Sequence, residues 1–168
     1  SQGLAGAVYV QEDTTDGRCD LHVDKSVFHG NSASFGTGAG GAIYVRDQAN
    51  VTISNSEFNQ NKAANHGGAV YLYDIKGAAN IKNTQFSNNQ SRSGGGGAIY
   101  ASARANVRKV KLTIESSRFR GNSSATYGGA VSMGDTINAT GDLTLFKVTF
   151  KKNKAKSSRS GAGGAVYM

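Results

Sequence analysis

The stretch Gly40-Gly41-Ala42-Ile43-Tyr44 decides the fold, because near-copies of it recur throughout the 168-residue chain. The other copies are Ala5-Gly6-Ala7-Val8-Tyr9, Gly67-Gly68-Ala69-Val70-Tyr71, Gly96-Gly97-Ala98-Ile99-Tyr100, Gly128-Gly129-Ala130-Val131-Ser132 and Gly163-Gly164-Ala165-Val166-Tyr167. A motif that returns about every 30 residues is typical of solenoids, in which each copy forms one coil. We therefore expect a stack of similar coils.

A second phrase lies between the copies of the first. It consists of an aliphatic residue, four others, Phe, two others and Asn. Its copies are Val23/Phe28/Asn31, Ile53/Phe58/Asn61, Ile81/Phe86/Asn89, Ile114/Phe119/Asn122 and Leu145/Phe150/Asn153. The spacing inside the phrases is constant while the segments between them differ in length, which indicates fixed strands joined by variable loops.

The apolar residues of both phrases have the period of a strand. Ile43 and Val45 alternate with Ala42 and Tyr44, and no connecting segment has a helical period. A leucine-rich horseshoe is excluded because its dense leucine pattern is absent. The sequence predicts an all-β fold, a right-handed single-stranded parallel β-helix of about five coils of 27–35 residues. Residues 1–168 are expected to form a single segment of a longer solenoid.

Each repeated residue has an expected structural role. The double Gly permits a sharp corner or close packing where a Cβ would clash. The Phe enters the core, and the Asn suits a tight bend because it tolerates left-handed geometry and can bond to the Asn of the next coil. The predicted ladder comprises Phe28, Phe58, Phe86, Phe119 and Phe150 with Asn31, Asn61, Asn89, Asn122 and Asn153.

Gly-Gly-Ala-Ile or Gly-Gly-Ala-Val paired with Phe-x-x-Asn resembles the repeats of the polymorphic outer membrane proteins of chlamydiae and related surface proteins. The resemblance covers essentially the whole chain, with departures such as Ser132 in place of Tyr and Ala5 in place of the first Gly. It implies an autotransporter-like passenger, a β-helix displayed outside the cell, attached to the outer membrane or secreted. The family is associated with adhesion.

Two classes of function remain open. The first is a non-catalytic scaffold, adhesin or surface-filament component with no catalytic residue. The alternative is a polysaccharide-active lyase or hydrolase of the pectate-lyase-like fold, whose chemistry needs clustered carboxylates. Glu57 and Glu115 are expected at one outward position two coils apart, about 10 Å between backbones, with Gln85 between them.

Neither a metal nor a cofactor is expected. His22, His29 and His66 lie in different registers, and Cys19 is the single cysteine. The net charge of +8 allows binding to acidic glycans, anionic membrane surfaces or nucleic acid, although no nucleic-acid motif is present. The apolar runs are far shorter than the roughly 20 residues of a membrane-spanning helix.

Two surfaces are candidates for binding a protein or glycan of a host or neighbouring cell, or further copies of the chain. The first is an outward tyrosine stripe, which a long loop or another subunit could instead cover: Tyr9, Tyr44, Tyr71, Tyr100 and Tyr167. The second is a basic final coil: Lys151, Lys152, Lys154 and Lys156. Asn50 and Asn138 lie in sequons and are possible glycosylation sites.

Overall fold

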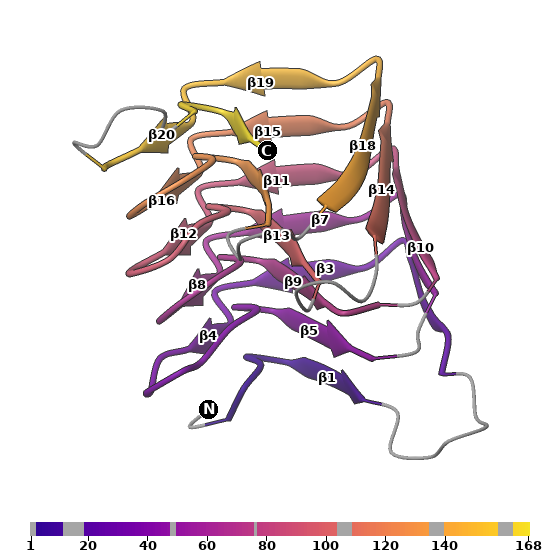
Figure 1. Cartoon of the computed structure of the whole chain (residues 1–168), viewed down its shortest axis with the longest axis horizontal. Helices are drawn as coiled ribbons and strands as arrows, with labels where there is room; N and C mark the ends of the chain where they lie inside the picture. Colours follow the sequence, from indigo (N-terminus) through magenta and orange to yellow (C-terminus); the bar gives the residue numbers. More distant parts are fainter. Residues whose placement is uncertain are drawn as a thin grey trace.

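The chain forms a solenoid of short β-strands (Figure 1). The computed structural model describes residues 3–11, 19–47, 50–75, 77–103, 109–134, 140–157 and 163–168. The regular secondary structure in these ranges consists of β-strands, which stack into four parallel sheets.

The four sheets form the walls of the coil. Sheet A contains β1 (Val8–Gln11), β5 (Ile43–Arg46), β9 (Val70–Tyr73), β13 (Ile99–Ser102), β17 (Val131–Met133) and β21 (Val166–Tyr167). Sheet B contains β2 (Leu21–Asp24), β6 (Val51–Ser54), β10 (Ala78–Lys82), β14 (Lys109–Glu115) and β18 (Thr140–Phe146). Sheet C contains β3 (Val27–His29), β7 (Glu57–Asn59), β11 (Gln85–Ser87), β15 (Arg118–Arg120) and β19 (Thr149–Lys151). Sheet D contains β4 (Ser32–Ala33), β8 (Lys62–Ala63), β12 (Gln90–Ser91), β16 (Ser123–Ser124) and β20 (Lys154–Ala155).

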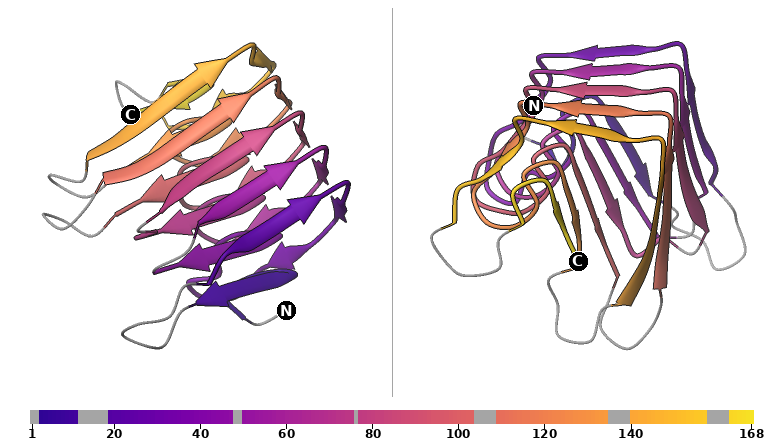
Figure 2. Two further views of the ribbon diagram at one scale, coloured as in Figure 1. Left: turned by 90° about the vertical axis from the view of Figure 1, so that its right-hand side faces the viewer. Right: turned by 90° about the horizontal axis from the view of Figure 1, so that it is seen from above.

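Each strand pairs in parallel with its equivalent in the next coil, so that Ile53, Ile81 and Ile114 lie in one row across sheet B. Viewed from above, with the C-terminal coils nearest, the chain advances counterclockwise toward the viewer (Figure 2), which makes the solenoid right-handed. The predicted fold is confirmed. Five stacked strands in sheets B, C and D are joined by four steps, so about four turns replace the expected five coils, a minor difference.

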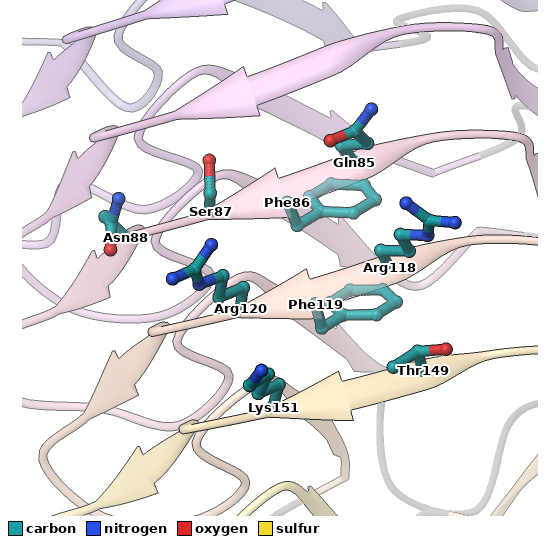
Figure 3. A pocket seen from close by; sticks show the side chains of 9 residues that line it. All are labelled: Gln85, Phe86, Ser87, Asn88, Arg118, Phe119, Arg120, Thr149 and Lys151. Atoms are coloured by element: carbon teal, nitrogen blue, oxygen red, sulfur yellow. The ribbon is translucent and has the colours of Figure 1, made fainter.

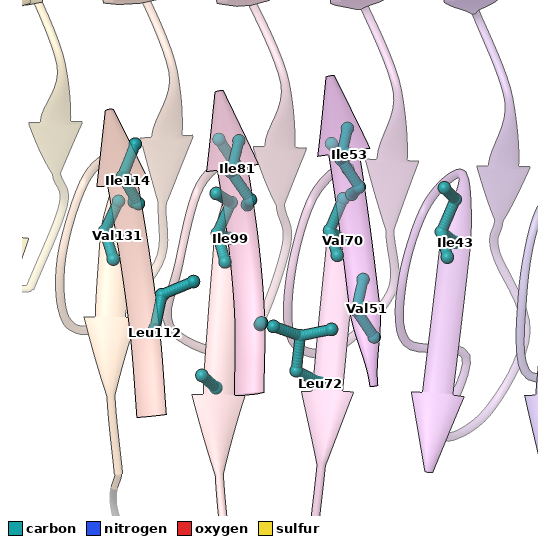
Figure 4. Packing of buried hydrophobic residues seen from close by; sticks show 14 of the residues in the cluster. Ile43, Val51, Ile53, Val70, Leu72, Ile81, Ile99, Leu112, Ile114 and Val131 are labelled. Carbon is teal, nitrogen blue, oxygen red and sulfur yellow. The ribbon is translucent and has the colours of Figure 1, made fainter. Parts of the chain in front are cut away.

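The core consists of apolar columns that run along the solenoid axis. Isoleucines of sheet B, such as Ile81 and Ile114, lie beside Ile99 and Val131 of sheet A (Figure 4). The Phe rings of sheet C stack with centroids 4.7–5.1 Å apart. Because each ring packs against the ring above and below, every coil supports its neighbours through the same contacts.

The two glycines of each pair serve different purposes. Gly67 adopts a left-handed conformation with φ of 63°, which costs a residue without a Cβ least. Gly68 lies so close to the next coil that a Cβ would be 2.1 Å from the carbonyl oxygen of Gly97. The first glycine therefore permits the turn, and the second permits the close approach of the coils.

The Asn ladder has a different backbone geometry from the expected one. At the bend between sheets C and D, the left-handed residue is the one before the ladder Asn, for example Asn88 with φ of 54° before Asn89. The Asn89 side-chain amide donates to Oδ1 of Asn122 at 3.0 Å and to the carbonyl oxygen of Phe58 at 2.9 Å. Its Oδ1 accepts from the backbone N–H and Nδ2 of Asn61. The ladder Asn thus contributes its side chain, while the preceding residue makes the bend.

Candidate functional site

The tyrosines of sheet A point away from the core, but most of them are covered. Tyr9 is 42% exposed, whereas Tyr44 is 6% and Tyr100 1% exposed; Tyr71 is half-buried. Burial raises the pKa of Tyr44 to about 12 because it disfavours the phenolate. The predicted exposed stripe is therefore wrong for Tyr44 and Tyr100.

The connections from sheet D to sheet A cover these rings. They comprise residues 34–42, 64–69, 92–98 and 125–130. Neighbouring connections are hydrogen-bonded to one another, as when the Gly67 N–H donates to the Gly95 carbonyl at 3.1 Å. The His66 imidazole stacks on Tyr100 with ring centroids 4.2 Å apart. The loops form a layer of their own over the outer face of sheet A.

A loop tyrosine also fills the place where the stripe is interrupted. Ser132 takes the position that Tyr holds in the other copies, and its side chain is fully buried. Tyr127 of the covering loop stacks on Tyr167 of the next coil, with centroids 4.5 Å apart. Tyr167 therefore keeps an aromatic neighbour although its register partner, Ser132, has no ring.

The outer face of sheet C, in contrast, carries an open groove of about 580 Å³. Side chains that line it include Gln85, Ser87, Arg118, Arg120, Thr149 and Lys151 (Figure 3). Arg118 and Arg120 flank the buried Phe119 on β15, and both are exposed. Because the Phe points inward, strand alternation directs both of its neighbours outward.

The groove is positively charged. Lys151 of β19 is the register partner of Arg120, so these cations lie one above the other on neighbouring coils. No ion pair joins Arg118, Arg120 or Lys151 to a carboxylate within the part of the chain that the structure describes. Guanidinium groups bind sulfate, phosphate and carboxylate through two parallel hydrogen bonds. This arrangement can therefore bind an anion.

The basic final coil does not form one patch with this groove. Lys151 lines it, but Lys152 makes the following bend with φ of 56°, Lys154 belongs to β20, and Lys156 follows that strand. All four side chains are exposed. Sequence reasoning missed Arg118 and Arg120, although aligning the Phe phrases would have placed Arg120 beside Lys151.

The expected relation between Glu57 and Glu115 is wrong. Glu57 lies on sheet C, where its row continues to Gln85. Glu115 lies on sheet B, where its register partner is Lys82, and their side chains form an ion pair of 3.3 Å. The reason is visible in the phrase itself, since Glu57 directly precedes its Phe whereas Glu115 directly follows its Ile.

The remaining sequence candidates are dispersed. Asn50 donates through Nδ2 to Asp20 at 2.9 Å and accepts from the Ala78 N–H at 3.3 Å, so its amide already bridges neighbouring coils. Asn138 lies outside the described residues. Cys19 is an exposed free thiol. The described ranges contain neither a group of three metal-ligating side chains nor a helix long and apolar enough to cross a membrane.

Comparisons with known proteins agree with this architecture. The family model of the Chlamydia polymorphic membrane protein repeat matches residues 25–46, 55–73, 83–102 and 147–168. Each match starts close to the corner between sheets B and C and ends in or just beyond the following strand of sheet A. Each matched repeat thus contains one strand from sheet C, one from sheet D and one from sheet A.

A relative from Escherichia coli (strain K12), described as "Probable autotransporter YfaL", is 29% identical over 100 residues. The match covers 56% of this chain and 8% of that protein, so the chain spans a small part of its relative. No solved structure matches significantly. The repeat and the relative both point to the cell surface or outer membrane. The chain is a β-solenoid that carries Chlamydia polymorphic membrane protein repeats, and part of it is similar to a probable autotransporter.

Proposed function

We propose that this chain is a non-catalytic surface scaffold with an adhesive role, exposed on the outer membrane or secreted. Its partner is a protein or glycan on a host or neighbouring cell, or a further copy of itself. The observation that carries the proposal is the uninterrupted stack of rings from Phe28 to Phe150 and of side-chain amides from Asn31 to Asn153.

Such a stack supports a stiff rod. Each coil is hydrogen-bonded to the next through the backbone of all four sheets and through the buried Asn side chains. Satisfied buried polar networks hold a single arrangement because an unpaired buried group costs about 1–3 kcal/mol. A rigid rod can hold the open face of sheet C at a fixed distance from the cell that carries it.

The test is an adhesion assay with the purified chain coupled to fluorescent beads. Beads are applied to cultured epithelial cells and to immobilised glycans, and the same protein is incubated with soluble polysaccharides to detect chain cleavage. We expect bead retention without release of shorter sugar chains. Cleavage of any polysaccharide would contradict a non-catalytic role.

The matched control carries Phe86→Ala and Phe119→Ala, which remove two adjacent rings from the stack while leaving the charge unchanged. This variant should lose its cooperative unfolding transition and its retention together. Equal retention of the folded chain and this variant would show that adhesion does not depend on the solenoid.

A further inference from the structure

The cations of the sheet C groove form a two-dimensional array. Arg118 and Arg120 are two residues apart on β15, which places their Cα atoms about 7 Å apart along the strand. Arg120 and Lys151 are register partners on adjacent strands, about 4.8 Å apart along the axis. A ligand with repeated negative groups can meet several of these cations at once, along the strand or across it.

The outer face of sheet B shows that this charge is a local feature. On sheet B, Lys82 pairs with Glu115 at 3.3 Å, and Lys111 is the register partner of Asp142. Lys82 and Lys111 thus have acidic register partners, whereas the register partners of Arg118, Arg120 and Lys151 among the described residues are neutral or cationic. Because the groove cations are not neutralised by carboxylates in the described part of the chain, their positive potential remains available to attract an external anion.

The groove also favours one class of polyanion. The rings of Phe86 and Phe119 beneath it are buried, so no aromatic surface is available in the groove for stacking bases, which binding to single-stranded nucleic acid uses. Reading duplex DNA needs a helix or ribbon that enters the major groove, and the surface of sheet C is the face of a sheet. Gln85, Ser87 and Thr149 supply neutral hydrogen-bonding groups suited to sugar hydroxyls.

We infer that the groove lined by Arg118, Arg120 and Lys151 binds a linear polysaccharide that carries sulfate or carboxylate groups. The inference rests on the proposed adhesive function and names its ligand class. Guanidinium groups bind the anionic substituents, and the neutral side chains between them contact the sugar hydroxyls.

The experiment measures binding of the purified chain to heparin, to polygalacturonate and to a single-stranded DNA oligonucleotide by titration calorimetry at several salt concentrations. The groove variant carries Arg118→Gln, Arg120→Gln and Lys151→Gln. A matched control carries Lys25→Gln, Lys82→Gln and Lys111→Gln, which remove the same charge from exposed positions elsewhere. Circular dichroism checks that both variants keep the wild-type melting behaviour.

We expect at least about tenfold weaker polysaccharide binding and a shallower salt dependence in the groove variant, and less than about threefold loss in the control. Binding of both heparin and polygalacturonate shows that either sulfate or carboxylate groups suffice. Binding of only one of them identifies the acidic group that the groove requires. An equal loss of affinity in both variants would overturn the groove assignment, because it would show that only the net charge of the chain matters. Tighter binding of DNA than of either polysaccharide at equal salt would overturn the ligand class.

The bead assay separates this inference from the proposed function. If the groove variant adheres to cells as well as the wild-type chain, the groove assignment fails while the adhesive function stands. If the wild-type chain itself does not adhere, the adhesive function fails regardless of the titration.

Discussion

The outer faces of sheets A and C are both formed by the outward residues of their strands, but much of the sheet A face is covered and the sheet C face is exposed. In both sheets, every second residue points away from the core. On sheet A one row of these residues consists mainly of tyrosines, of which Tyr44 and Tyr100 are buried and Tyr9, in the first strand, is exposed. On sheet C they are polar or charged apart from Val27, and the face stays open to solvent.

Connection length explains the difference. In one coil, only residues 55–56 lie before the sheet C strand β7, and only residues 60–61 lie after it. Six residues, 64–69, join sheet D to sheet A, and they fold back over the sheet A surface. An outward position in a strand therefore stays open to solvent only where the adjoining connections are too short to cover it.

The largest loss of stability is expected from a substitution on the covered face of sheet A. Tyr100→Ala should lower the free energy of unfolding by about 3–5 kcal/mol, because it empties a fully buried aromatic site beneath the loops. Arg118→Ala on sheet C should change it by less than about 0.5 kcal/mol. Urea unfolding measures both. Similar losses would show that the two faces do not differ in burial.

Alkaline pH should also affect the covered face. The folded chain keeps the Tyr44 proton up to pH of about 12, because its pKa is raised there, whereas the unfolded chain loses it near pH 10. Between these values the unfolded state binds fewer protons, so stability falls as pH rises through this window, by at most about 3 kcal/mol. Tyr44→Phe should remove this part of the decline in urea midpoints between pH 9 and 12. An unchanged decline would show that Tyr44 is not responsible.

A smaller effect should follow from loosening the cover. His66→Ala removes the ring stacked on Tyr100 and the Nδ1 acceptor of the Gly95 N–H at 3.2 Å. We expect a loss of about 1 kcal/mol and faster hydrogen exchange in residues 92–98, with sheet C unchanged. Mass spectrometry of exchanged peptides measures this. His22→Ala, at an exposed position of sheet B, is the control and should leave those peptides unaffected.

The smallest effect on stability should come from the open face. Thr149→Glu places a carboxylate beside its register partner Arg118, and an exposed pair of this kind contributes about 0–1 kcal/mol. The same change should lower retention on a heparin column, because it neutralises part of the groove. Thr113→Glu on sheet B is the matched control and should retain more of the heparin affinity. Equal reduction by both would show that position on the surface is unimportant.

The sequence was sufficient for the fold because its signals are local and repeated. The constant spacing from Ile81 through Phe86 to Asn89 places these side chains at fixed points of each coil. The candidate site was less predictable. Whether Tyr100 is exposed depends on where a loop from another part of the coil packs, and the proximity of Arg120 to Lys151 depends on register between segments 31 residues apart.

The Asn ladder has a consequence for the gene. Every bond between the ladder Asn side chains runs in the same direction, from Nδ2 of one Asn to Oδ1 of the next, as between Asn61, Asn89 and Asn122. A coil therefore presents the same acceptor to the coil before it and the same donor to the coil after it. Recombination between two copies of the repeat can add or delete one coil without redesigning the core, so that the length of the rod can vary while its cross-section is conserved.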